Sequence, residues 1–165
     1  NGGCHDHDEQ AGEYAGSIHA EAIAAGDYTA ASCGSCHGGH DIARLDTQAA
    51  IDALHLSSEA MCAECHQDQW DNYGDAYHGA AYKRGALDAP ACWDCHPAHE
   101  VLAADHPDST INAANIGTTC ATCHEQHGDA GEEFATFSAE MIHRQEELRA
   151  DNVLHKLLSL IPGGK

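Results

Sequence analysis

Four segments of the chain place two cysteines and a histidine at the same spacing, C-x-x-C-H. They comprise Cys33, Cys36 and His37; Cys62, Cys65 and His66; Cys92, Cys95 and His96; and Cys120, Cys123 and His124. In this pattern two thiols add to the vinyl groups of one porphyrin, and the following imidazole ligates its iron. The spacing therefore predicts four covalently attached haem c groups.

Cysteine pairs at this spacing have other uses. They build Cys4 zinc sites, exchange disulfides in thioredoxin-like folds, or form structural bridges. None of these uses needs a histidine after every second cysteine, and 15 histidines in 165 residues would rarely fall there four times by chance. The haem interpretation is therefore favoured over the other three.

The second axial ligand of each iron is expected to be histidine as well. Methionine can take this position, but the chain has only Met61 and Met141, and Met61 adjoins a haem-binding cysteine. Eleven histidines remain outside the motifs. Bis-histidine ligation implies lower reduction potentials than ligation by histidine and methionine.

The sequence contains a tandem duplication with an offset of 59 residues. Each half carries two of the motifs, and one residue is lost between the two motifs of the second half. The matching pairs are Tyr14 and Tyr73, His19 and His78, Ala22 and Ala81, Gly26 and Gly85, His40 and His99, and Asp46 and Asp105. The chain is therefore predicted to be two dihaem modules.

The duplication selects the candidate distal ligands. His19 with His78, and His40 with His99, are the non-motif histidine pairs that repeat at this offset, so they predict the other four iron ligands. His40 and His99 each follow a motif histidine by three positions, which is too close to reach the other face of the same porphyrin. We expect them to ligate a neighbouring haem.

Two arrangements remain open for His19 and His78. If His78 reaches back to a haem of the first module, symmetry requires His19 to ligate a haem of another subunit. If one chain instead completes all four sites, His143 or His127 would complete the set.

We predict four regions along the chain. Residues 1–13 form an N-terminal arm, 14–72 the first dihaem module, 73–133 the second, and 134–165 a C-terminal amphipathic helical segment. Short helices are expected over 14–25, 47–54 and 73–82. The role of Cys4, the ninth cysteine, stays open between a free thiol, an intermolecular bridge and a haem held by one thioether.

The composition predicts a mostly irregular fold with short α-helices, built around a stack of four haems, without significant β-sheet. Only 5% of the residues are aromatic, so the polypeptide supplies few large apolar side chains for a core of its own. Four porphyrins would provide the missing apolar surface. A chain without them is expected to be largely unfolded.

The charge restricts the partners. With 27 acidic and 7 basic residues, the formal charge of −20 disfavours nucleic acid and anionic membrane surfaces. The sequence has no run of 18 apolar residues, so no membrane span is expected. Haem attachment of this type implies maturation outside the cytoplasm, and we expect an extracellular or periplasmic location with any export signal removed.

The motifs and their flanking histidines resemble the multihaem c-type cytochromes from Tyr14 to His127. Ser17 to Ala22 leading into Cys33 to His40, and Tyr77 to Ala81 leading into Cys92 to His99, are similar to tetrahaem electron-transfer cytochromes, including subunits of extracellular cytochrome filaments. In such filaments, the resemblance implies, haems form one continuous chain and a histidine crosses between subunits.

The resemblance and the ligand count together predict electron transfer without a substrate, and not an enzyme. A polymerising nanowire subunit, with His19 as a possible intersubunit ligand, is slightly favoured over a monomeric periplasmic shuttle; both would exchange electrons with redox partner proteins. A small multihaem oxyanion reductase is disfavoured by the seven basic residues. A haem-storage or structural protein is the third alternative.

Overall fold

The computed structural model describes residues 7–39, 42, 44–74, 77–124 and 142–143. These residues form short helices joined by irregular segments, and no strand is present among them. One isolated antiparallel bridge joins Tyr73 and His143. The helices are α1 (Asp8–Ala15), α2 (Ile18–Ala24), α3 (Cys33–His37), α4 (Gln48–His55), the π-helical turn η1 (Glu59–Ala63), α5 (Gln67–Asn72), α6 (Gly79–Tyr82), α7 (Cys92–Cys95) and α8 (Ile116–His124). The predicted fold class is confirmed in this respect, while the haem stack stays a prediction.

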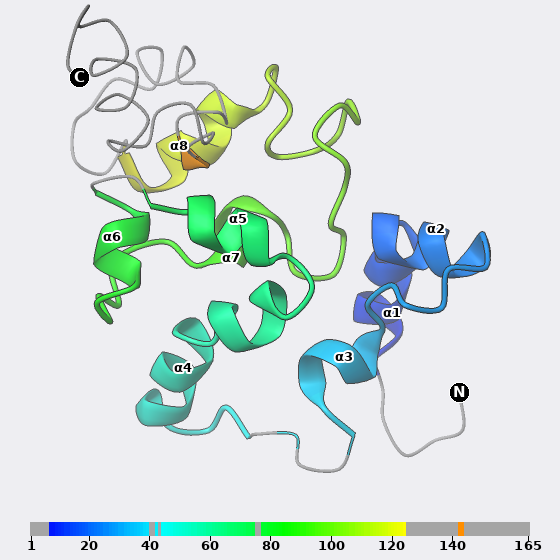
Figure 1. Cartoon of the computed structure of the whole chain (residues 1–165), viewed down its shortest axis with the longest axis horizontal. Helices are drawn as coiled ribbons and strands as arrows, with labels where there is room; N and C mark the ends of the chain where they lie inside the picture. The colour runs from blue at the N-terminus through cyan, green and yellow to red at the C-terminus, as the bar shows by residue number, and fades with distance from the viewer. Residues whose placement is uncertain (1–6, 40–41, 43, 75–76, 125–141, 144–165) are drawn as a thin grey trace, which may run out of the picture.

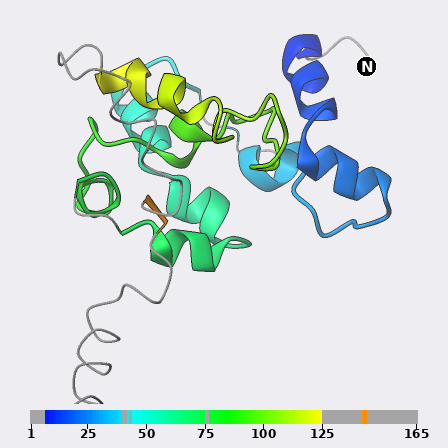
Figure 2. The ribbon, with the colours of Figure 1, turned by 90° about the horizontal axis from the view of Figure 1, so that it is seen from above.

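The helices fall into two groups in space. In both views α1 and α2 lie at one end of the molecule, and α4, α5 and α6 lie at the other (Figures 1 and 2). The chain passes between the two groups through α3. No helix within the described ranges is both long and apolar enough to cross a membrane.

The duplication is visible as a repeated tyrosine contact. The hydroxyl of Tyr14 donates a hydrogen bond to the carbonyl oxygen of Ala31 at 2.6 Å, and the hydroxyl of Tyr73 donates one to that of Pro90 at 2.7 Å. Both bonds span 17 residues and end just before a C-x-x-C-H motif. Each tyrosine therefore holds the start of its motif against a preceding helix.

A glycine turn also repeats. Gly26 and Gly85 have φ values of 99° and 87°, in the left-handed region that favours glycine. The amide of the next residue donates to the carbonyl oxygen five positions earlier in both turns. This is the Schellman arrangement, which satisfies the carbonyls at the end of a helix and directs the chain toward the motif.

The start of each first motif is capped in the same way. The amide of Ser32 donates to the side chain of Ser35 at 3.0 Å, and the amide of Ala91 donates to the carboxylate of Asp94 at 2.7 Å. In both motifs, the residue directly before the second cysteine therefore accepts a hydrogen bond from the amide that precedes the first cysteine. We define the first repeat as residues 8–66 and the second as 67–124, since α1 and α5 are also equivalent.

The buried apolar core lies in the second repeat. Among the described residues it comprises Tyr73, Tyr82, Ala89 and Ala91, with Trp70, Ala81, Ala86, Trp93 and Ile142 packed around them. Their equivalents in the first repeat include no comparable cluster. Within the part of the chain that the structure describes, the polypeptide thus provides a small apolar core in the second repeat but not in the first.

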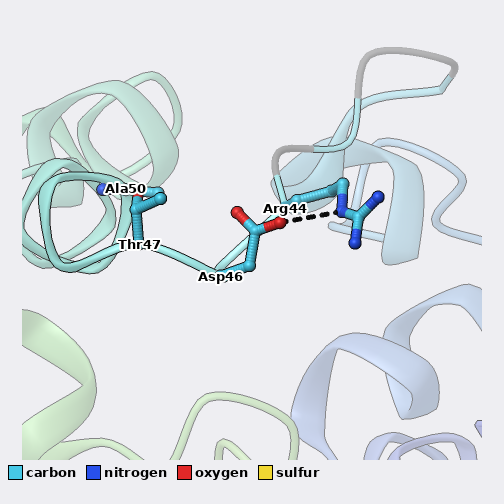
Figure 3. A network of polar contacts seen from close by, with 4 residues as sticks. All are labelled: Arg44, Asp46, Thr47 and Ala50. Atoms are coloured by element: carbon cyan, nitrogen blue, oxygen red, sulfur yellow. Dashed lines mark hydrogen bonds and ion pairs between the residues drawn. The ribbon is translucent and has the colours of Figure 1, made fainter.

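Helix α4 matches the prediction closely. Its N-cap is Thr47, whose hydroxyl accepts a hydrogen bond from the amide of Ala50 at 3.2 Å (Figure 3). Arg44 and Asp46 form an ion pair at 3.2 Å just before it. Because both side chains are exposed, this pair contributes little stability.

Three predictions about local structure were wrong. Residues 8–13 are helical rather than a loose arm. The acidic side chains of Asp8 and Glu9 stabilise the positive N-terminal end of the α1 dipole, so the helix forms without an apolar stripe. The helix expected over 14–25 is interrupted at Ser17, a fully buried N-cap. Among the described residues of the expected 73–82, those at 79–82 are helical and those at 73, 74, 77 and 78 are not. The amphipathic segment 134–165 lies outside the described residues, apart from residues 142 and 143.

Candidate functional site

Each of the four motif histidines faces one other histidine from a distant part of the chain. The distances between ring centroids are 6.1 Å for His37 and His99, 6.2 Å for His66 and His19, 6.4 Å for His96 and His143, and 6.0 Å for His124 and His78. None of these four ring contacts joins two motif histidines. The structure therefore contains four pairs of imidazoles with the same composition.

The spacing of these pairs matches two axial ligands on one iron. Metal–nitrogen bonds of about 2.0–2.1 Å, with a further ~1.1 Å from each nitrogen to its ring centre, place trans imidazole centroids about 6.3 Å apart. Among the described residues, no group of three or more His, Cys, Asp or Glu side chains could hold a metal ion. Two imidazoles alone leave four equatorial positions, which the nitrogens of a porphyrin fill. The residues present therefore fit haem.

The cysteines of the motifs lie beside these pairs. In α3, α7 and α8 the two cysteines are three positions apart on a helix, so that their side chains share one face. The second motif differs, because η1 contains Cys62 and ends before Cys65. All eight motif cysteines have free thiols. Each motif can thus present two thiols and one imidazole to the same edge and face of a porphyrin.

The His37–His99 pair joins the two repeats. The amide of Ile18 donates to the carbonyl oxygen of Val101 at 2.8 Å, which fixes the segment after the third motif against α2. His99 Nδ1 lies 3.2 Å from a carboxylate oxygen of Glu13 on α1. With Nδ1 hydrogen-bonded to a carboxylate, Nε2 is left for a metal, as is common for ligating histidines.

The His96–His143 pair is arranged in a similar way. His143 Nδ1 lies 3.1 Å from the carbonyl oxygen of Gln69 on α5, so Nε2 again is left for a metal. The ring of His143 also packs on Tyr73, with centroids 6.0 Å apart. Burial, and next the charges of His143 and His66, lower the pKa of His96. The neutral imidazole, which is the ligating form, is favoured.

The His19–His66 pair depends on α2. Ser17 begins this helix and accepts a hydrogen bond from the amide of Ala20 at 3.2 Å, which sets the position of His19 in the first turn. Burial, followed by the charge of His66, lowers the pKa of His19. His19 is therefore also held toward its neutral, ligating form.

The His78–His124 pair is the equivalent of His19–His66 in the second repeat. His78 precedes Gly79, where a Cβ atom would lie only 2.5 Å from the carbonyl oxygen of Tyr73. Glycine therefore allows the backbone at His78 to approach the end of α5. His124 is the last residue of α8.

The pairing differs from two sequence-based expectations. His78 faces His124 of its own repeat rather than a histidine of the first module, because α6 packs beside residues 73 and 74. His19 faces His66 within the chain, which removes the reason to place its iron in another subunit. His99 faces His37 of the other repeat rather than the histidine of its own motif, and ligation of a neighbouring haem stays a prediction.

The remaining candidates are distributed as follows. The sequence predicted His143 only as an alternative ligand, because it has no repeat partner. In the structure it faces His96. The only available signal for it was its position after the fourth motif. His40, His127 and Cys4 lie outside the described residues. Two further histidines have other contacts: His55 Nε2 is 2.9 Å from the carbonyl oxygen of Ala89, and His106 Nδ1 accepts from the amide of Asp108.

The thiols of the second and third motifs lie together. Interaction between the Cys62 and Cys92 thiols lowers the pKa of Cys92 to about 6 and raises that of Cys62. Burial raises the pKa of Cys95 to about 11. The cysteines of these neighbouring motifs are thus close enough to influence one another's pKa values.

Comparison with known proteins identified no relative of this chain. A scan against protein-family models, a search of curated proteins and a search of solved structures each gave no match.

Proposed function

We propose that this chain is an electron-transfer protein that carries four haem c groups. The observation that carries the proposal is the set of four imidazole pairs, each containing one motif histidine and each with the centroid spacing of two axial ligands. Eight free thiols in four C-x-x-C-H motifs supply the covalent attachment.

The residues have separate roles in this proposal. The thiols would tether the porphyrins, and the paired imidazoles would ligate the irons from both sides, which would leave no position for a substrate. The Glu13 carboxylate and the Gln69 carbonyl orient two of the distal rings. Bound haem iron supplies one-electron chemistry, and bis-histidine ligation sets low potentials.

We propose that a single chain is sufficient for this function. All four pairs form within one chain, so ligation needs no second subunit. The arrangement therefore supports the monomeric shuttle over the polymerising nanowire, in contrast to the preference stated from the sequence. Sedimentation of the purified holoprotein distinguishes the two, and polymers that dissociate only with loss of low-spin haem would favour the nanowire.

A reductase finds less support. It requires an iron with an open axial position and basic groups close to it. Lys83 instead lies over the ring of Trp70, 4.5 Å from its centroid, and donates a hydrogen bond to the carbonyl oxygen of that residue. Arg44 forms an exposed ion pair with Asp46. An extracellular or periplasmic location remains part of the proposal, because thioether attachment requires maturation outside the cytoplasm.

A reductive titration of the purified holoprotein tests the proposal. We expect stepwise, reversible uptake of four electrons per chain and no spectral change on adding carbon monoxide or nitrite. Carbon monoxide binding to one iron in each chain would favour the reductase. Failure to take up electrons reversibly would contradict electron transfer altogether.

A further inference from the structure

Ser58 is a buried polar residue that connects the two repeats. It has no exposed surface. Its amide donates a hydrogen bond to the hydroxyl of Tyr82 at 3.0 Å, and its own hydroxyl accepts one from the amide of Cys92 at 3.2 Å. The Tyr82 hydroxyl in turn donates to the carbonyl oxygen of His55 at 2.6 Å. The buried side-chain oxygens of Ser58 and Tyr82 therefore both have hydrogen-bond partners.

The hydrogen bonds of Ser58 and Tyr82 lie between the second and third motifs. Ser58 immediately precedes η1, which contains Cys62, and it holds the first residue of α7, Cys92. The Cys62 and Cys92 thiols shift each other's pKa values, so they are neighbours in space. The second and third porphyrins would thus be tethered at adjoining points.

The other two junctions also join consecutive motifs. Helix α3, which carries the first motif, packs against η1 of the second. Between the third and fourth motifs, the hydroxyl of Thr110 donates to the carbonyl oxygen of Cys95 at 2.5 Å, and the hydroxyl of Thr119 donates to that of Thr110 at 2.7 Å. Thr119 directly precedes Cys120 in α8. Each motif is therefore in contact with the next one along the chain.

We propose that the four attachment sites follow one another in space in the order of the sequence, and that Ser58 is the positioning residue for the junction of the second and third sites. This inference rests on the proposed electron transfer. The Cys62–Cys92 junction then brings porphyrins of the two repeats side by side, in addition to the His37–His99 pair that also joins the repeats. The first and fourth sites become the two ends of the path.

Two pairs of variants test the positioning role. Ser58→Ala removes the acceptor for the Cys92 amide, and Tyr82→Phe removes the hydroxyl that meets the Ser58 amide while it keeps the ring. Ser57→Ala is the matched serine control, because the Ser57 hydroxyl contacts only Leu54 and Met61 in its own segment. Tyr28→Phe, at a residue that is 84% exposed, is the tyrosine control.

The readout is electron equilibration among the irons of the holoprotein after a flash of photoreduction, with thermal unfolding measured in parallel. We expect Ser58→Ala and Tyr82→Phe to slow one phase severalfold, while both controls leave every phase unchanged. Equal kinetics in all four variants would overturn the role of Ser58. A wild-type protein without any intramolecular phase would instead contradict the proposed function.

The spatial order is tested without any variant. An experimental structure of the wild-type holoprotein should place the porphyrins in the order of their motifs, with the thioethers of Cys62 and Cys92 adjacent. A different order, or a separation of these two thioethers by another porphyrin, would overturn the inference while leaving electron transfer intact.

Discussion

The two repeats share a framework and differ in what surrounds it. Both have a tyrosine bond to the backbone before the motif and a glycine turn at the end of a helix. The second repeat adds an apolar cluster in which Tyr82 is 3% exposed. At the equivalent positions of the first repeat, Ala11 replaces Trp70, Ile23 replaces Tyr82 and Gly34 replaces Trp93.

The difference separates two functions of the sequence. The features present in both repeats place histidines and cysteines, whereas the apolar cluster occurs in one repeat only. Residues that position the imidazole pairs therefore do not need a polypeptide core around them. In the first repeat, the apolar surface of a porphyrin is the expected substitute.

A second difference concerns how distal histidines are oriented. In the first repeat α1 offers the carboxylate of Glu13 to His99, and in the second α5 offers the carbonyl oxygen of Gln69 to His143. Equivalent helices thus perform the same task with groups of different charge. An anionic acceptor makes its imidazole the more basic ligand and favours ferric iron more strongly.

The largest expected effect is on the apolar cluster. Tyr82→Ala should lower the free energy of unfolding of the holoprotein by about 3–5 kcal/mol, because a buried aromatic ring is lost and a cavity remains. Ile23→Ala, at the half-buried equivalent position, should cost less. Thermal or denaturant unfolding of both variants measures the difference. Equal losses would contradict the view that only the second repeat has a polypeptide core.

A smaller effect is expected at Gly79. Gly79→Ala would push a Cβ atom to 2.5 Å from the Tyr73 carbonyl oxygen and should destabilise by roughly 1–3 kcal/mol. It should also release part of His78 from iron, measured as high-spin absorbance. Gly12→Ala is the matched control, because no atom lies within 4 Å of its Cβ and alanine favours the interior of α1. If neither variant showed high-spin absorbance, the close approach at Gly79 would not be needed to hold His78 on its iron.

The contrast in orientation can be tested through Glu13. Glu13→Gln should raise the reduction potential of one iron by an amount on the order of 59 mV, a tenfold change in a one-electron equilibrium. Glu9→Gln on the same helix removes the same charge and serves as the control. Protein-film voltammetry of both variants gives the comparison. Equal shifts in both variants would show a general effect of charge rather than the His99 contact.

The smallest expected effect is the loss of thermal stability at acidic pH. Burial lowers the pKa values of His19 and His96 below the ordinary histidine value of about 6.5, so the unfolded chain binds more protons than the folded one just below this pH. Their contribution to stability is therefore present above pH 6.5 and is lost as the pH falls toward the folded pKa values. The thermal midpoint should decrease over this window. A midpoint that rises on acidification from pH 6.5 would contradict this sign.

The sequence was informative where the signal is local. The motifs, the helix at 48–55 and the glycine turns depend on spacings of a few residues, and the offset of 59 residues exposed His19, His78 and His99. The pairing of these histidines depends on contacts such as Ile18 with Val101, which no periodicity encodes. His143 has no repeat partner, and α1 has no apolar stripe, so neither had a strong signal.

The central claim is that each motif histidine shares one iron with a single distant histidine of the same chain. Electron paramagnetic resonance of the oxidised, purified holoprotein, with haem counted per chain on monomeric material, tests it most directly. We predict four haems per monomer, all low-spin with two histidine ligands. Fewer than four haems, a high-spin signal from any iron, or thiols that are free or bound to zinc would contradict the account.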